Sequence, residues 1–205
     1  MDPRLKHPFT ALVAGPTGCG KSTLVKQLVE HQAELIDPVP EQILWYYGEW
    51  QPLYESMPGV EFIEGLPDMQ TLQNQKRKLV IIDDLMTETN KSITALFTKG
   101  SHHLNLSVLH LVQNVFDGNK QARTISLNAH YLVIFKNPRD ASQITHLAKQ
   151  MYPGHVKYLQ EAFRDATSKP FGYLLVDLKQ DTPEHMRLRT NILPHQRQYV
   201  YLRKV

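Results

Sequence analysis

The chain alternates between two hydrophobic patterns. Short, continuous apolar runs are typical of buried β-strands, and segments with apolar residues about every three or four positions are typical of helices. Because the runs are apolar on both faces, we expect a mainly parallel sheet covered by helices on both sides. We expect strands over 9–15, 42–48, 60–65, 78–85, 106–114, 129–138 and 171–178, and 187–193 could pair with the last as a hairpin. The segment over 48–65 is rich in Pro, Gly and aromatic residues, so we expect it to cross the surface, with 60–65 as a short strand within it.

Helical patterns separate most of these runs, and they are expected over 22–35, 90–100, 119–127, 140–151 and 156–163. Strands that alternate with helices predict an α/β fold with right-handed crossovers. With 205 residues, of which 41% are hydrophobic, the chain is large enough for a sizeable core. We therefore expect a single domain over 1–205, with a basic C-terminal extension at about 184–205.

The net charge of +3 is only mildly basic and gives little information about partners. The distribution of charge is more informative, because the chain carries no Asp or Glu after position 187. The basic residues of this stretch are Arg187, Arg189, Arg197, Arg203 and Lys204.

The sequence also bears on the compartment. No apolar run approaches the roughly 20 residues that a membrane-spanning helix needs, and the first residues lack the apolar stretch of a signal peptide. Cys19 is the only cysteine, so an internal disulfide is impossible. We expect a soluble, intracellular protein with no membrane partner.

The most informative motif lies between the first expected strand and the first expected helix. The stretch from Gly15 to Ser22 matches G-x-x-x-x-G-K-[ST] without a mismatch. Glycines let backbone N–H groups approach phosphates, and a helix that begins at Lys21 directs its positive dipole end at them. We expect Lys21 to reach the β- and γ-phosphates of ATP, Ser22 to ligate Mg²⁺ and Thr23 to help hold the α-phosphate. The expected phosphate-binding residues are Gly15, Pro16, Thr17, Gly18, Cys19, Gly20, Lys21, Ser22 and Thr23.

Cys19 occupies a variable position of this loop. We interpret it as a small filler and not as a nucleophile, because a thiolate there would repel the phosphates.

Two carboxylates end the strand expected over 78–85. "LVIIDD" is a Walker B pattern in which Asp83 is expected to hold Mg²⁺, usually through water. Neighbouring residues at a strand end point in different directions, so Asp84 is a candidate to orient or deprotonate the attacking water. Asp84 could instead only cap the following turn, and Glu88 is a second candidate base.

The strand over 106–114 ends in two amides, Gln113 and Asn114. The carboxyl ends of parallel strands line the ligand crevice in folds of this kind. We expect Gln113 to sense the γ-phosphate or the attacking water, although the pair could simply end the strand in a turn.

Hydrolysis also needs positive charge on the transition state, which a neighbouring subunit often supplies through an arginine. Arg123, on the helix expected over 119–127, is our first candidate. Arg139, which follows the strand over 129–138, is the second. Each could instead form a surface salt bridge or contact DNA phosphates.

The pair His102 and His103 does not predict a metal site, because adjacent side chains point apart and no further ligand follows at a suitable spacing. A contact to DNA or to a neighbouring subunit fits these histidines better.

These blocks together resemble a known family. "GPTGCGKST", "LVIIDDLM", "FTKGSHHLNLSVLHLVQNVF" and "SLNAHYLVIFKNPRD" are similar to the genome-packaging ATPases of polinton-like and adintovirus-type DNA viruses. Those are relatives of the poxvirus packaging ATPase in the FtsK–HerA superfamily. The resemblance covers the chain from about Phe9 to Ile192, and the later blocks are more specific than the two nucleotide-binding motifs.

The resemblance implies a RecA-like (ASCE) P-loop NTPase core that uses ATP and Mg²⁺. It also implies a ring, hexameric or pentameric, that pumps double-stranded DNA into a capsid and works with a capsid or portal component at the viral assembly site of the infected cell. Lys21, Ser22, Asp83, Asp84 and Gln113 match the family's functional positions. Many superfamily members carry Glu where this chain has Asp84, which is one methylene shorter.

A ring would gather basic loops around a channel and hold the DNA backbone without reading bases. The C-terminal basic stretch, the 98–105 loop and Lys120 are candidates for that surface or for subunit contacts, and solvated surface is the alternative.

Two other function classes stay open. A small P-loop nucleotide kinase would share the phosphate loop but would need an acceptor site, and it would not need the second carboxylate. A nucleotide-dependent interaction module would bind ATP without efficient turnover.

Overall fold

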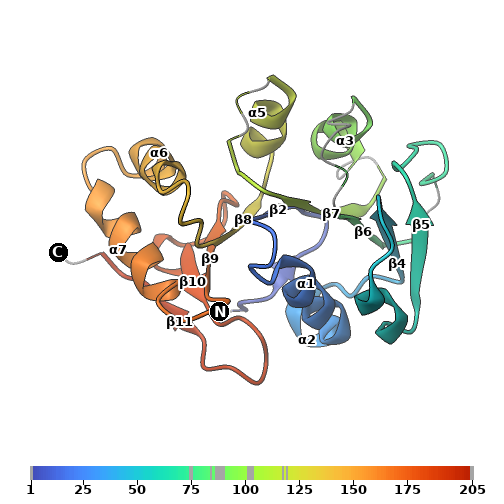
Figure 1. Cartoon of the computed structure of the whole chain (residues 1–205), viewed down its shortest axis with the longest axis horizontal. Helices are drawn as coiled ribbons and strands as arrows, with labels where there is room; N and C mark the ends of the chain where they lie inside the picture. Colours follow the sequence, from blue (N-terminus) through green and yellow to red (C-terminus); the bar gives the residue numbers. More distant parts are fainter. Residues whose placement is uncertain are drawn as a thin grey trace.

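The computed structural model describes residues 2–73, 76–83, 85, 91–100, 104–116, 118 and 120–203. A nine-stranded sheet runs through the centre, and helices cover both of its faces (Figure 1). The order across the sheet is β11 (Tyr199–Val200), β10 (Leu188–Thr190), β9 (Tyr173–Asp177), β8 (Tyr131–Phe135), β2 (Thr10–Ala14), β7 (Leu106–Val112), β6 (Lys78–Asp83), β4 (Gln42–Tyr47) and β5 (Val60–Glu64).

The strands from β8 to β5 are parallel, and β9, β10 and β11 are antiparallel additions at one edge. The predicted α/β fold with a mainly parallel sheet is therefore confirmed. The predicted C-terminal hairpin also forms, with Leu188 of β10 opposite Val176 of β9. A separate two-stranded parallel ladder joins β1 (Leu5–Lys6) to β3 (Ile36–Asp37).

The helices fall into two groups according to the face of the sheet they cover. α1 and α2 lie on one side, and α3, α5 and α6 lie on the other (Figure 1). The first group is α1 (Lys21–Glu30), α2 (Gln32–Leu35) and the 3-10 helix η1 (Pro52–Ser56). The second is α3 (Lys91–Ala95), the π-helix η3 (Leu96–Gly100), α5 (Lys120–Leu127), α6 (Ser142–Met151) and α7 (Val156–Ala166), while the 3-10 helix η4 (Glu184–Met186) precedes β10.

Strand β2 explains why the apolar runs are continuous. Its residues alternate between two buried clusters: Leu12 and Ala14 face one cluster, and Ala11 and Val13 face the other. Successive side chains of a strand point to opposite faces, so a strand buried on both sides must be apolar at every position.

The parallel arrangement brings several strand ends to one edge. The carboxyl ends of β2, β6 and β7 meet there, because these strands are neighbours and run in the same direction. The antiparallel β9 starts at this edge, which brings the residues just before Tyr173 to the same place. Ligands bind at such an edge in open α/β sheets.

The segment over 48–65 differs from expectation, because it does not simply cross the surface. Within it, η1 buries Tyr54, which is only 2% exposed. Its ring stacks on Phe62 with centroids 4.9 Å apart, and it also contacts Trp45, Tyr47 and Trp50. Tyr54 and its aromatic neighbours therefore extend the buried cluster that lies on the α1 side of the sheet.

Among the described residues, no helix combines the length and the apolar character that crossing a membrane requires.

Candidate nucleotide-binding site

The loop over 15–22 joins β2 to α1 and curves around the start of that helix. Gly20, which precedes α1, has a φ of 102°, a conformation that glycine adopts without steric cost. At Gly15 a Cβ atom would lie 2.6 Å from Cys19 Sγ and 2.7 Å from Phe135 Cβ, so no side chain fits there. The first N–H groups of a helix have no partner within the helix, so those of α1 could bind an anion.

Cys19 packs inside this loop. Its side chain is half-buried, and burial raises the pKa of the thiol. A neutral thiol agrees with the prediction that Cys19 fills space and is not a nucleophile.

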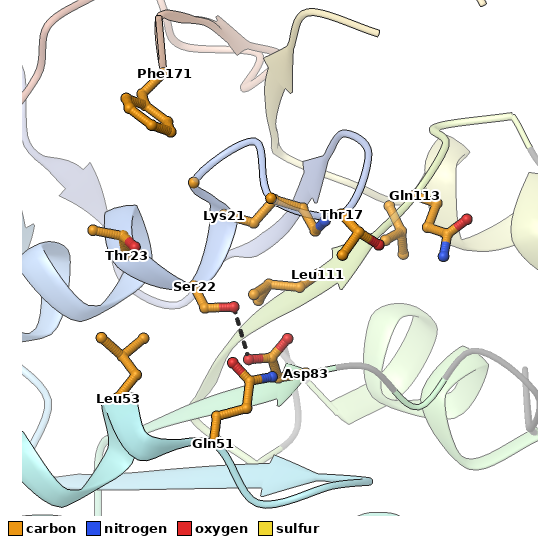
Figure 2. A pocket seen from close by; sticks show the side chains of 13 residues that line it. Thr17, Lys21, Ser22, Thr23, Gln51, Leu53, Asp83, Leu111, Gln113 and Phe171 are labelled. Carbon is orange, nitrogen blue, oxygen red and sulfur yellow. Dashed lines mark hydrogen bonds between the residues drawn. The ribbon is translucent and has the colours of Figure 1, made fainter. Parts of the chain in front are cut away.

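Lys21 extends over the loop. Its Nζ donates hydrogen bonds to the carbonyl oxygens of Gly15, at 2.8 Å, and Pro16, at 3.2 Å. In Figure 2 the ammonium group points toward Thr17, along the inner side of the loop. The positive charge thus lies where the predicted phosphates would be.

Ser22 and Asp83 come together from segments 61 residues apart. The Ser22 hydroxyl donates to Asp83 Oδ2 at 3.0 Å (Figure 2), and Asp83 is 3% exposed at the end of β6. A hydroxyl and a carboxylate are the oxygen donors that Mg²⁺ prefers. The pair therefore fits the ion that the motifs predict.

Tyr54 also forms a hydrogen bond to Asp83. Its hydroxyl, on η1, donates to the same Oδ2 atom at 3.1 Å. Two donors on one buried oxygen fix the direction of the carboxylate.

A pocket of about 360 Å³ opens between these groups. Its size is in the range of small-molecule sites. It is lined by Thr17, Lys21, Ser22 and Asp83, together with Gln113, which follows β7, and Phe171, which precedes β9.

The two amides after β7 have different surroundings. Gln113 is exposed and lines the pocket. Asn114 Oδ1 accepts hydrogen bonds from Gln143, at 2.9 Å, and from Asn137, at 3.4 Å. One amide thus reaches the pocket, and the other ties the end of β7 to α6 and to the loop after β8.

Several predicted residues are not in the pocket. Arg123 lies on α5, as expected, and is exposed, and Arg139 is exposed in the loop after β8. No arginine is among the described residues that line the pocket. The predicted base Asp84, the second candidate Glu88, and His102 and His103 lie outside the residues that the structure describes.

The basic C-terminal stretch divides into two parts. Arg187 pairs with Glu184 at 2.7 Å, and Arg189, 2% exposed, pairs with Asp177 at 3.0 Å. Arg187 and Arg189 therefore form ion pairs within the chain. Arg197 and Arg203 remain exposed.

The residues near the site that were not predicted include Gln51, Leu53, Tyr54 and Phe171. Gln51 and Tyr54 belong to the segment expected on the surface, and only the Pro52 that begins η1 marks a helix there. The position of Phe171 follows from β9 being antiparallel, which the predicted hairpin did not determine.

Comparison with known proteins places this pocket in context. No protein-family model matches the chain. A segment of 40 residues is 52% identical to packaging protein 1 of canine adenovirus serotypes 1 and 2. This segment is 20% of the chain and only 8% of the length of those relatives.

The structural matches extend much further. The genome packaging NTPase B204 of Sulfolobus turreted icosahedral virus 2, solved with ATP-gammaS, matches with a TM-score of 0.54 at 14% identity, over 98% of each chain. The chain shares its fold with a viral genome-packaging NTPase. EssC (ATPases 2 and 3) of Geobacillus thermodenitrificans matches with a TM-score of 0.55 at 13% identity, over 95% of this chain and 39% of EssC. The predicted P-loop NTPase fold is confirmed, and the packaging NTPase among these matches is the kind of protein that the sequence motifs resemble.

Proposed function

We propose that the chain is an ATP-hydrolysing translocase that packages viral double-stranded DNA into a capsid. One observation carries the proposal. Lys21 and Ser22 of the phosphate loop converge with Asp83 on a single pocket, in a fold shared with a genome packaging NTPase. The local match to adenovirus packaging protein 1 supports the same reading.

The residues of the loop explain how ATP would bind. The N–H groups at the start of α1 and the Lys21 ammonium would hold the β- and γ-phosphates. Ser22 would ligate Mg²⁺ directly and Asp83 would hold it through water, and the ion neutralises charge on the phosphates when bound. Asp83 keeps its direction through the hydrogen bonds from Ser22 and Tyr54.

Turnover needs a positioned water and positive charge on the transition state. Asp84, directly after Asp83 in the sequence, is the proposed group that orients or deprotonates the water, with Glu88 as the second candidate. Gln113 is the proposed sensor of the γ-phosphate, and its place in the pocket supports this role.

The arginine is proposed to come from a neighbouring subunit of a hexameric or pentameric ring. Arg123 is the first candidate and Arg139 the second. Both are exposed, and neither lines the pocket of its own chain, which fits a residue that acts on a neighbour.

The ring is proposed to hold duplex DNA through its phosphates and to work with a capsid or portal component in the infected cell. Within the part of these predicted segments that the structure describes, the exposed lysines and arginines are Lys99, Lys120, Arg197 and Arg203. Contacts of this kind are independent of sequence and weaken as salt rises.

Release of free phosphate from ATP, measured with and without duplex DNA, tests the proposal. We expect DNA to stimulate release, and we expect Lys21→Ala to abolish it. Lys157→Ala, which removes an exposed lysine from α7, is the matched control and should keep nucleotide turnover. Transfer of the phosphoryl group to a nucleoside monophosphate would overturn the proposal and indicate a kinase.

A further inference from the structure

Phe171 is an aromatic side chain exposed at the rim of the pocket. It is 70% exposed and precedes β9, whose start lies at the carboxyl edge of β2 and β8. The ring lines the pocket together with the phosphate loop, although it is about 150 residues away from that loop in the sequence. Water thus reaches most of an apolar ring beside the predicted phosphate site.

The backbone holds this ring in a fixed place. Phe171 has a φ of 61°, which is rare for a bulky side chain and costs conformational energy. The next residue, Gly172, donates its N–H to Lys169 O at 3.1 Å. A Cβ atom at Gly172 would lie only 2.4 Å from Ala166 O, so the turn is too tight for any other residue. This turn presents Phe171 to the pocket.

The ring lies against the phosphate loop. A Cβ atom placed on Gly20 would be 3.2 Å from Phe171 Cδ1, which puts the ring next to the backbone where α1 begins. The ring therefore borders the place where bound phosphates would meet the helix.

The pocket has two chemically different sides. Thr17 and Gln113 lie on one side, near the Lys21 ammonium, while Phe171, Thr23 and Leu53 lie on the opposite side (Figure 2). Phosphates held at Lys21 and Ser22 leave the second side for the nucleoside. Of the three side chains there, two are apolar and one carries a single hydroxyl.

We propose that Phe171 is the platform on which the base of the bound nucleotide stacks. An aromatic ring binds any base through its π-face, and a purine offers more area than a pyrimidine. Phenylalanine has no polar atom, so it favours purines by area and not by hydrogen bonding. The inference rests on the proposed nucleotide binding and names the residue that adds affinity for the base.

Calorimetric titration with ADP, CDP and inorganic pyrophosphate, in the presence of Mg²⁺, tests this inference. We expect Phe171→Ala to weaken ADP binding by roughly 10- to 100-fold, because it removes one base–aromatic stack. Pyrophosphate has no base, so its affinity should stay the same. The preference for ADP over CDP should shrink in Phe171→Ala and persist in Phe171→Tyr.

Leu127→Ala is the matched control, because Leu127 is also a strongly exposed apolar side chain, at 68%, and lies on α5. It should change none of the three affinities. An unchanged ADP affinity in Phe171→Ala would overturn the inference. An equal loss of ADP and pyrophosphate would also overturn it, because Phe171 would then only support the loop.

The same titrations separate this inference from the proposed function. A wild-type protein that binds neither ADP nor pyrophosphate contradicts the proposed function. A wild-type protein that binds both, with Phe171→Ala behaving identically, contradicts only the stacking role.

Discussion

The Tyr54 hydroxyl donates a hydrogen bond to Asp83 Oδ2 at 3.1 Å, which joins helix η1 to the end of β6. Ser22 donates to the same oxygen at 3.0 Å. The carboxylate that we propose to serve the metal is therefore oriented by two segments, one from the phosphate loop and one from an aromatic cluster. A partner such as Tyr54 tunes metal affinity although it does not touch the ion.

Tyr54→Phe should keep the ring in its aromatic cluster and remove only the hydroxyl. We expect the Mg²⁺ concentration needed for half-maximal phosphate release to rise roughly 10-fold, in the range seen when the partner of a metal ligand is lost. Tyr47→Phe is the matched control, since Tyr47 contacts the same ring at a centroid distance of 5.6 Å. Equal Mg²⁺ dependence in both variants would show that the hydrogen bond only supports the fold.

Asp84→Asn tests the proposed base. An amide cannot accept a proton from water, so turnover should fall by roughly 100-fold or more while ATP affinity is kept. Glu88→Gln is the comparison, because it removes the second candidate. Normal turnover in Asp84→Asn together with a large loss in Glu88→Gln would transfer the role to Glu88.

Mixed assemblies test the proposed arginine. Arg123→Ala subunits keep an intact phosphate loop, and Lys21→Ala subunits keep an intact arginine. Mixing two inactive variants should restore part of the phosphate release, because some interfaces then combine both intact parts. If mixtures with Arg139→Ala recover and those with Arg123→Ala do not, Arg139 is the residue that acts on the neighbour.

His110 gives a prediction about stability. It lies within β7, and neither of its ring nitrogens has a hydrogen-bond partner among the described residues. Burial lowers its pKa to about 4. The unfolded chain, with a histidine pKa near 6.5, binds the proton first, so the fold loses stability as the pH falls from about 6.5 toward 4.

Chemical denaturation at pH 7 and pH 5 measures this effect. The loss due to His110 should be about 2 kcal/mol over that interval. His110→Leu lacks this titrating group. Between pH 7 and pH 5 it should therefore lose about 2 kcal/mol less unfolding free energy than the wild-type protein. An identical pH dependence in both proteins would show that His110 titrates normally in the fold.

The pair of Arg189 and Asp177 gives a second stability prediction. Both residues are buried, and their charged atoms are 3.0 Å apart. Arg189→Met would leave the Asp177 carboxylate without its charge partner in the interior, at a cost of about 3–5 kcal/mol. Glu30→Ala, which removes the exposed ion pair between Glu30 and Lys26, should cost less than about 1 kcal/mol. Similar midpoints of urea unfolding for the two variants would contradict this account.

The sheet and the phosphate loop could be predicted because their signals are local. A strand buried on both faces must be apolar throughout, as β2 and β6 are, and the loop needs its glycines and its lysine in a fixed order. Ser22 and Asp83 could be paired in advance, because Ser22 follows β2 and Asp83 ends β6, and both strands are parallel members of the same sheet.

Tyr54, Phe171 and Arg189 could not be predicted, because their roles depend on tertiary placement. Tyr54 belongs to a Pro- and aromatic-rich segment that resembles a surface loop, and Phe171 depends on the direction of β9 and on an unusual φ. In the sequence, Arg189 is one of several basic residues near the C-terminus. Only the register of β10 against β9 places it diagonally across from Asp177.

Displacement of a triplex-forming strand from duplex DNA is the most direct test of the central claim, because a protein that moves along the duplex strips the third strand. We predict that the wild-type chain displaces it when ATP and Mg²⁺ are present, and that Lys21→Ala does not. Phosphate release at the normal rate without any displacement would contradict the account, because the pocket would then hydrolyse ATP without driving movement along DNA.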